Sequence, residues 1–251
     1  MQTLNNQTAL VTGAGSGIGQ DIAVKLAQMG ANVVITGRKE APLKETAALH
    51  GNISYIVADM GKTEDVSRVL VEIKQKFNRL DIMVNNAGMA PVTPIAKFDT
   101  VFNINVRAVV DLTTQALPLL KESKGSIVNI GSAVANQPLP NMSVYSASKA
   151  ALKTLTFVWA KELAKDGIRV NNIAVGPIET PIYEKTELSA EEAQAHKDRV
   201  TSLVPLGRFG QPKDISAIVA LSGFRRRQLH HWRGYCRGWW IWYLKNNSGC
   251  L

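Results

Sequence analysis

The eight residues TGAGSGIG, Thr12–Gly19, follow a short apolar run and open a helical pattern. Gly13 permits a tight turn, Gly17 lets the backbone approach a pyrophosphate, and Gly19 allows close packing of the helix on the strand. The start of the helix would offer free N–H groups and a positive dipole end to an anion. Because strand, turn and helix follow one another, the glycine pattern predicts a dinucleotide site.

Outward from this turn, the chain alternates short apolar runs with longer helical patterns. Runs that are apolar on both faces and joined by helices indicate a parallel sheet covered on both sides, and right-handed crossovers make it doubly wound. We therefore predict one α/β domain of Rossmann type over residues 1–221 and an atypical segment at 222–251. The strands are expected at Thr8–Thr12, Asn32–Thr36, Ile53–Ala58, Leu80–Asn85, Ser126–Ile130 and Arg169–Val175. The helices include Gly17–Met29, Ser146–Lys165 and a charged segment, Glu184–Val200, that would cover a site.

The composition argues against several classes of protein. The formal charge of +9 suits a nucleic-acid binder, but six basic residues and no acidic ones follow Leu221, which leaves 23 − 20 = +3 for the rest. Both cysteines also lie in that last segment, so the preceding residues hold no disulfide framework. No apolar run is long enough to span a bilayer, and the start lacks a secretory pattern. We expect a cytoplasmic protein without nucleic-acid or membrane partners.

Tyr145 and Lys149, in YSASK, would share one face of a helix because they are four residues apart. An ammonium beside a phenol favours the phenolate, so we expect the pKa of Tyr145 to fall from about 10 toward working pH. Tyr145 would then exchange a proton with a carbonyl or alcohol oxygen. Ser132 ends a predicted strand, where open sheets bind ligands, and its hydroxyl would stabilise developing charge.

The glycine spacing Gly-x-x-x-Gly-x-Gly, with NNAG (Asn85–Gly88), YSASK (Tyr145–Lys149) and PLGRFGQPKDI (Pro205–Ile215), resembles the short-chain dehydrogenases/reductases. The resemblance runs from about residue 8 to about residue 220. It implies an oxidoreductase, a homotetramer, and a catalytic tetrad of Asn105, Ser132, Tyr145 and Lys149. In the family, the asparagine that matches Asn105 holds a water that links the lysine to solvent.

The resemblance also implies which residues hold the nicotinamide cofactor. Ile178 would pack on the nicotinamide and Thr180 would hold its carboxamide, although Val175 replaces a proline common in this loop. Asp59 would lie beside the adenine, or serve only as a helix N-cap. The implied set is Gly13, Ser16, Gly17, Ile18, Gly19, Arg38, Asp59, Asn86, Ala87, Gly88, Tyr145, Lys149, Pro177, Ile178 and Thr180.

The end of the second predicted strand bears on the choice between NADP and NAD. Gly37 stands where NAD-dependent members of the family tend to carry Asp, and Arg38 and Lys39 follow. A guanidinium matches a 2′-phosphate by bidentate geometry, so we favour NADP (NADPH), with NAD possible. Arg38 is otherwise a solvated surface residue.

The substrate is less closely defined by the sequence. We expect a secondary alcohol or ketone, with a 3-oxoacyl thioester or a sugar such as glucose as alternatives, and an NADP-binding sensor without turnover as the non-enzyme alternative. PVTPIAKFDTVF, residues 91–102, is shorter than usual for the family and would alter a substrate-side loop. The substrate wall is expected at Val134, Ala135, Asn136, Leu139, Met142 and the segment Ile182–Arg199.

The last segment lacks the family's usual ending. One possible coding of Ser222–Leu244, read one base later, gives LASDAANYITGGAIAVDGGFGI, which contains that ending. Tryptophan has a single codon, so Trp239, Trp240 and Trp242 must each become glycine in the shifted frame. We interpret the segment as a frameshift product, which an intact mass would test. A nucleic-acid arm, a metal site at His230, His231 and Cys236, and a membrane-surface anchor are the alternatives.

Overall fold

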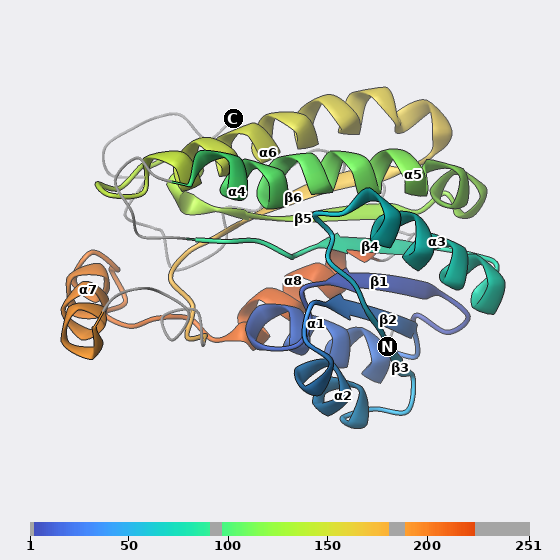
Figure 1. Cartoon of the computed structure of the whole chain (residues 1–251), viewed down its shortest axis with the longest axis horizontal. Helices are drawn as coiled ribbons and strands as arrows, with labels where there is room; N and C mark the ends of the chain where they lie inside the picture. The colour runs from blue at the N-terminus through green and yellow to red at the C-terminus, as the bar shows by residue number, and fades with distance from the viewer. Residues whose placement is uncertain (1–2, 91–96, 181–188, 224–251) are drawn as a thin grey trace.

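The computed structural model describes residues 3–90, 97–180 and 189–223, which form a parallel sheet between two helical layers (Figure 1). The sheet has six strands in the order β3-β2-β1-β4-β5-β6. The strands are β1 (Thr8–Thr12), β2 (Asn32–Gly37), β3 (Ile53–Val57), β4 (Ile82–Asn85), β5 (Ser126–Ser132) and β6 (Arg169–Val175). The predicted doubly wound α/β fold is therefore confirmed.

The helices cover both faces of the sheet, as Figure 1 shows. One layer holds α1 (Gly17–Gln28), α2 (Glu40–Ala48) and α8 (Pro212–Gly223), and the other holds α3 (Thr63–Phe77), α4 (Phe98–Phe102), α5 (Ala108–Ser123) and α6 (Ser143–Glu162). A π-helical turn, Asn103–Arg107, joins α4 to α5. Helix α7 (Ala190–Ser202) lies apart from both layers.

Alternation along β1 explains why the sheet needs two layers. Every residue of β1 is buried. Ala9 and Val11 belong to the apolar core beneath α1 and α8, whereas Leu10 belongs to the core beneath α3 and α5. Successive side chains of a strand point to opposite faces, so a strand that is apolar throughout must be covered twice.

The strand order reverses at β1, which pairs with β2 on one side and β4 on the other. In open α/β sheets, a ligand binds in the crevice that such a reversal leaves at the carboxyl ends of the strands. The glycine turn after β1 and the NNAG loop after β4 meet at this crevice. The topology therefore positions the site before any side chain is considered.

Helix α7 contains residues 190–200 of the helix expected over Glu184–Val200, and residues 184–188 lie outside the described residues. Its start at Ala190 follows a capping box, in which Ser189 and Glu192 satisfy each other's backbone N–H groups. Residues 91–96, in the loop expected to be short, lie outside the described part as well. So do residues 224–251, and the frameshift and the segment boundary stay predictions.

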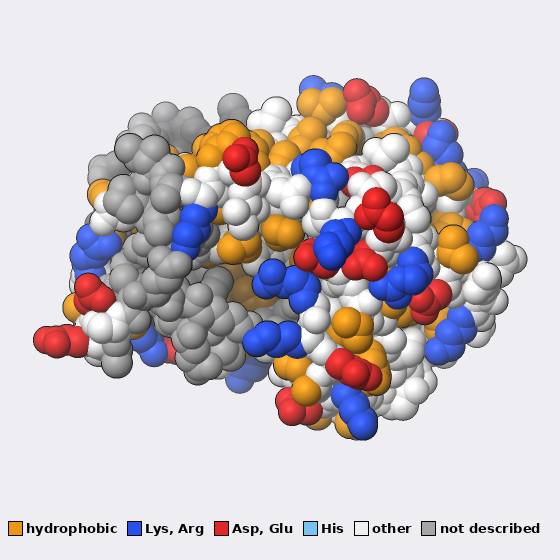
Figure 2. Space-filling view, viewed as in Figure 1, with side chains coloured by type: hydrophobic (Ala, Val, Ile, Leu, Met, Phe, Trp, Pro, Cys, Tyr) orange, Lys and Arg blue, Asp and Glu red, His pale blue; other side chains and the backbone are white. Residues whose placement is uncertain are grey.

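The surface shows mixed charge. On the face in Figure 2, Lys and Arg side chains are interspersed with Asp and Glu among the described residues. Within residues 3–90, 97–180 and 189–223, no helix has the length and apolar character to cross a bilayer. The same ranges contain no cluster of His, Cys, Asp or Glu suited to a metal ion.

Candidate active site

The turn between β1 and α1 has a backbone that only glycine fits well. Gly13 and Gly17 have φ of +66° and +59°, in the left-handed region. A Cβ on Gly13 would lie 2.8 Å from the Ala87 Cα, and one on Gly19 would lie 2.5 Å from the Asn86 Nδ2. The turn is thus pressed against the loop that follows β4, and it opens the N-terminus of α1 toward the crevice.

Thr12, which sequence reasoning did not single out, fastens the turn to that loop. Its hydroxyl oxygen accepts the N–H groups of Asn86 at 3.1 Å and Ala87 at 3.0 Å, and it donates to the Val84 carbonyl at 3.3 Å. The Asn86 Nδ2 donates to the carbonyls of Thr12 at 2.9 Å and Gly13 at 3.0 Å. The Asn86 side-chain nitrogen therefore shapes the cradle.

A cavity of about 790 Å³ occupies the crevice. Every residue that the sequence assigned to the cofactor lines it, as does Ser132. The glycine cradle, which a Cβ would fill, and the open start of α1 fit a pyrophosphate. The described residues thus suit an extended dinucleotide, with Arg38 and Asp59 near the second and third strands and Thr180 after β6.

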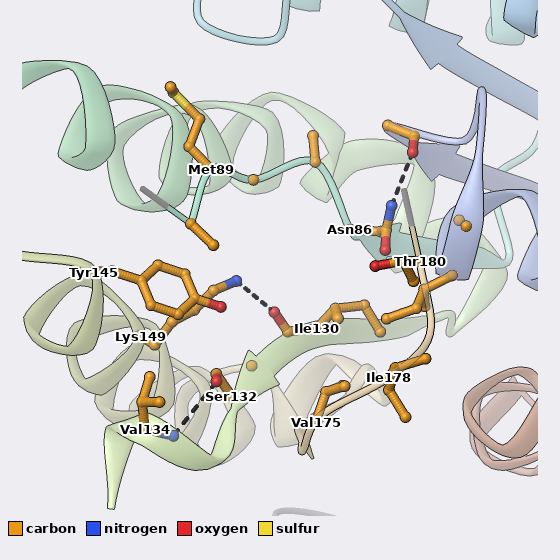
Figure 3. Close-up of a pocket in the computed structure, with 18 of the residues that line it drawn as sticks. Asn86, Met89, Ile130, Ser132, Val134, Tyr145, Lys149, Val175, Ile178 and Thr180 are labelled. Carbon is orange, nitrogen blue, oxygen red and sulfur yellow. Dashed lines mark hydrogen bonds between the residues drawn. The ribbon is translucent and has the colours of Figure 1, made fainter. Parts of the chain in front are cut away.

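Tyr145 and Lys149 reach the cavity from α6, and Ser132 reaches it from the end of β5 (Figure 3). The Ser132 hydroxyl lies close enough to the Tyr145 phenol to lower its pKa. The Lys149 ammonium donates to the Ile130 carbonyl at 2.8 Å and lies 5.8 Å from the centre of the Tyr145 ring. Three of the four predicted catalytic residues are therefore together.

The expected direction of the Tyr145 pKa is wrong for this arrangement. Burial of its hydroxyl raises the pKa above 10, and the nearby Ser132 hydroxyl opposes that only in part. The Lys149 ammonium is directed at a strand carbonyl and not at the phenol. Burial also lowers the pKa of Lys149 to about 8. Tyr145 is thus a phenol at neutral pH, a form suited to giving a proton.

The model of the short chain dehydrogenase family matches residues 7–191. This chain belongs to the short-chain dehydrogenase family.

Individual relatives agree with that membership. The chain is 35% identical to a 3-oxoacyl-[acyl-carrier-protein] reductase of Thermotoga maritima, over 86% of this chain and 89% of that protein. The crystal structure of a 3-ketoacyl-(acyl-carrier-protein) reductase from Brucella melitensis complexed with NADH is 31% identical, with a TM-score of 0.79 over 87% of this chain and 91% of that one. The crystal structure of levodione reductase is 30% identical, with a TM-score of 0.82 over 87% of this chain and 90% of that one. The protein is therefore an oxidoreductase of a family that uses nicotinamide cofactors.

Asn105 of this short-chain dehydrogenase lies behind the cavity wall. Its Oδ1 accepts the Met89 N–H at 2.8 Å, and its Nδ2 donates to the Met89 carbonyl at 2.9 Å and the Ser148 hydroxyl at 3.0 Å. The side chain is 1% exposed and sits on the π-helical turn, a feature frequent at functional sites. Its side-chain contacts make Asn105 a positioning residue for the loop that carries Gly88 and Met89.

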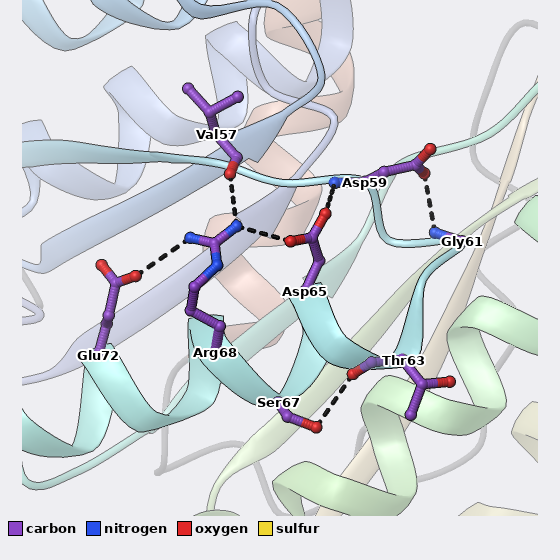
Figure 4. A network of polar contacts seen from close by, with 8 residues as sticks. All are labelled: Val57, Asp59, Gly61, Thr63, Asp65, Ser67, Arg68 and Glu72. Carbon is purple, nitrogen blue, oxygen red and sulfur yellow. Dashed lines mark hydrogen bonds and ion pairs between the residues drawn. The ribbon is translucent and has the colours of Figure 1, made fainter.

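Figure 4 shows the polar contacts that fix the end of the cavity where Asp59 lies. The Asp59 Oδ1 accepts the Gly61 N–H at 2.9 Å, and the Asp59 N–H donates to Asp65 at 2.8 Å. Arg68 binds the Val57 carbonyl at 2.8 Å and Asp65 at 2.7 Å. Helix α3 is capped by Lys62, so Asp59 is not its N-cap.

The wall of the cavity that was predicted to contact the substrate is mostly apolar, and only some of the predicted residues form it. Val134, Leu139 and Met142 line it, whereas Ala135 and Asn136 do not. Asn136 instead accepts a hydrogen bond from Lys153 at 2.5 Å. Sequence reasoning missed Met89, Gln137, Pro138, Leu203 and Val204, whereas Val200 ends the segment Glu184–Val200 that was expected to cover the site. Val200, Leu203 and Val204 lie near the end of α7 or directly after it, so this helix does contribute to the wall, but through its C-terminal end.

The buried ammonium of Lys149 predicts a pH-dependent stability. The pKa of Lys149 is about 8 in the folded protein and 10.5 for an unburied lysine. Between these two pH values the unfolded chain therefore binds more protons than the folded protein. The free energy of unfolding should therefore rise with pH across this window. Between about pH 7 and pH 10, the free energy of unfolding of the wild type should rise by up to about 3 kcal/mol relative to that of Lys149→Met. Urea unfolding at each pH measures both. A difference that stays constant with pH would contradict the burial of this charge.

Proposed function

We propose that this protein reduces a ketone to a secondary alcohol with NADPH and catalyses the reverse oxidation. The observation that carries the proposal is the Tyr145 phenol, enclosed at its hydroxyl and close to the Ser132 hydroxyl at the carboxyl end of β5. A phenol that keeps its proton at neutral pH can give it to a carbonyl oxygen as the alcohol forms. A bound reduced nicotinamide supplies the hydride.

The roles of the surrounding residues follow from their positions. Ser132 orients the carbonyl oxygen and stabilises its developing negative charge. Lys149 lies beside Gly88, where a Cβ would be 3.6 Å from its Nζ, so the ammonium is close to the loop that borders the cofactor. Pro177, Ile178 and Thr180 form the side of the cavity assigned to the nicotinamide. Asn105 holds the loop after β4.

The preference for NADPH rests on Arg38. It lines the cavity, is exposed, and makes no hydrogen bond or ion pair with any residue that the structure describes. Residue 37, beside it, is a glycine, so no acidic side chain stands there to repel a phosphate. An unpaired guanidinium at this place suits a 2′-phosphate.

Replacing Arg38 with alanine tests the cofactor preference. The KM for NADPH should rise about tenfold, because a charge-assisted hydrogen bond is worth roughly 1.5 kcal/mol at an exposed position. The KM for NADH should stay unchanged. Lys44→Ala, which removes an exposed charge on α2 outside the cavity, is the control. Equal loss with both cofactors, or a wild type that prefers NADH, would overturn the NADP assignment.

A second substrate class, the 3-oxoacyl thioester, is favoured by the similarity to the reductase of Thermotoga maritima. Comparing a 3-oxoacyl thioester with simple ketones in the same assay separates the two. We also propose a cytoplasmic homotetramer, which rests on the family resemblance and is tested by the mass of the assembly in solution.

A further inference from the structure

The wall around the catalytic hydroxyls is apolar with one exception. Among the described residues, it is formed chiefly by Met89, Val134, Leu139, Met142 and Val204. The charged residues that line the cavity are Arg38, Asp59 and Lys149, which are assigned to the cofactor or to catalysis. Such a wall disfavours a charged substrate, because a desolvated charge without a partner is costly.

Gln137 is the exception. It lines the cavity, and its side-chain amide makes no hydrogen bond to any residue within the described ranges. An amide in a largely apolar pocket has both donor and acceptor capacity to offer a ligand. The functions already assigned to Ser132, Tyr145 and the cofactor residues do not use it.

The backbone of Gln137 is held close to the reacting centre. Its N–H donates to the Ala133 carbonyl at 3.0 Å. Because Ala133 directly follows Ser132, this bond holds the Gln137 backbone about one helical turn from the catalytic serine. The neighbouring Asn136 is bound by the Lys153 ammonium at 2.5 Å. Lys153 is four residues after Lys149 on α6, so the same helix that carries the catalytic pair also anchors this loop.

We infer that Gln137 is a specificity-determining residue that recognises a second, uncharged oxygen of the substrate, a few bonds from the reacting ketone. The substrate class is then a ketone that also carries an ester, ketone or hydroxyl oxygen. This inference rests on the proposed ketone reduction. A substrate without the second oxygen leaves the Gln137 amide unpaired, which lowers its affinity.

Two ketones of equal chain length test the inference. Ethyl 3-oxobutanoate carries the second oxygen, and 2-heptanone does not. The measured quantity is the ratio of kcat/KM for the ester to kcat/KM for 2-heptanone. This ratio is compared between variants, so the difference in intrinsic reactivity between the two ketones cancels. Gln137→Leu should lower this ratio about tenfold and raise kcat/KM for 2-heptanone. Gln28→Leu, the same change at an exposed position outside the cavity, should leave the ratio unaltered.

An unchanged ratio in Gln137→Leu would overturn the inference. Absence of turnover by the wild type of both ketones and of a 3-oxoacyl thioester would instead refute the proposed function. In that case the same two ligands are titrated calorimetrically into the NADPH complex of Tyr145→Phe, with and without Gln137→Leu. About tenfold tighter binding of the ester that disappears in the double variant supports the inference, and equal binding of the two ligands rejects it.

Discussion

Replacing Tyr145 with phenylalanine should lower kcat for ketone reduction about 10³-fold, because general acid catalysis contributes about 10²- to 10⁴-fold. The ring stays, and only the hydroxyl that is enclosed beside Ser132 is removed. Binding of NADPH should remain within about threefold, since the cradle is built by the glycine turn and Thr12. Steady-state kinetics and fluorescence titration measure the two quantities.

Tyr145→Phe is informative because kcat should fall while NADPH binding is retained. A variant that lost cofactor binding and turnover together would show that the phenol supports the pocket and not the chemistry. Turnover retained within about tenfold of the wild type would remove Tyr145 from the role of acid, since a missing catalytic acid costs more than that.

Replacing Gly13 with alanine should weaken NADPH binding about 100-fold. The left-handed backbone at φ of +66° costs a side chain about 1 to 2 kcal/mol, and the added Cβ would lie 2.8 Å from the backbone of Ala87. Relief of that contact must displace the turn from the loop after β4, which moves the N–H groups that would face the pyrophosphate. A fluorescence titration with NADPH gives the affinity.

Gly207→Ala is a matched control for this substitution. Gly207 has a φ of +63°, but a Cβ there meets no atom within 4 Å. It should lose about 1 kcal/mol of stability and keep its affinity for NADPH. If Gly13→Ala also kept its affinity, the glycine cradle would not be the pyrophosphate site.

The sequence predicted the strands well where apolar residues run unbroken. Strands β1 and β6 have the predicted bounds. Strand β4 starts two residues later than expected, at Ile82, and Asp81 lies just before it. The Asp81 carboxylate takes the Arg79 guanidinium at 2.6 Å and the Thr8 N–H at 2.9 Å. The contact with Thr8 joins residues 73 positions apart in the chain, so periodicity does not reveal it.

The same limit explains the error over the Tyr145 pKa. A spacing of four residues places Tyr145 and Lys149 on one helix face, and it says nothing about the third partner. That partner is the Ile130 carbonyl, which strand β5 brings to the ammonium. Gln137 and Val204 were missed for a related reason, because their approach to the cavity depends on how loops fold back.

Hydride transfer itself is the central claim, and isotope transfer tests it most directly. The protein is incubated with NADPH that carries deuterium at both hydrogen positions of nicotinamide C4, and with ethyl 3-oxobutanoate, 2-heptanone and a 3-oxoacyl thioester. Each product is analysed by mass spectrometry. We predict that one deuterium appears on the carbinol carbon of an alcohol for each NADPH oxidised, and that Tyr145→Phe forms this product about 10³-fold more slowly. Tight NADPH binding with no deuterated alcohol from any of these ketones would contradict the account and favour a cofactor-binding sensor.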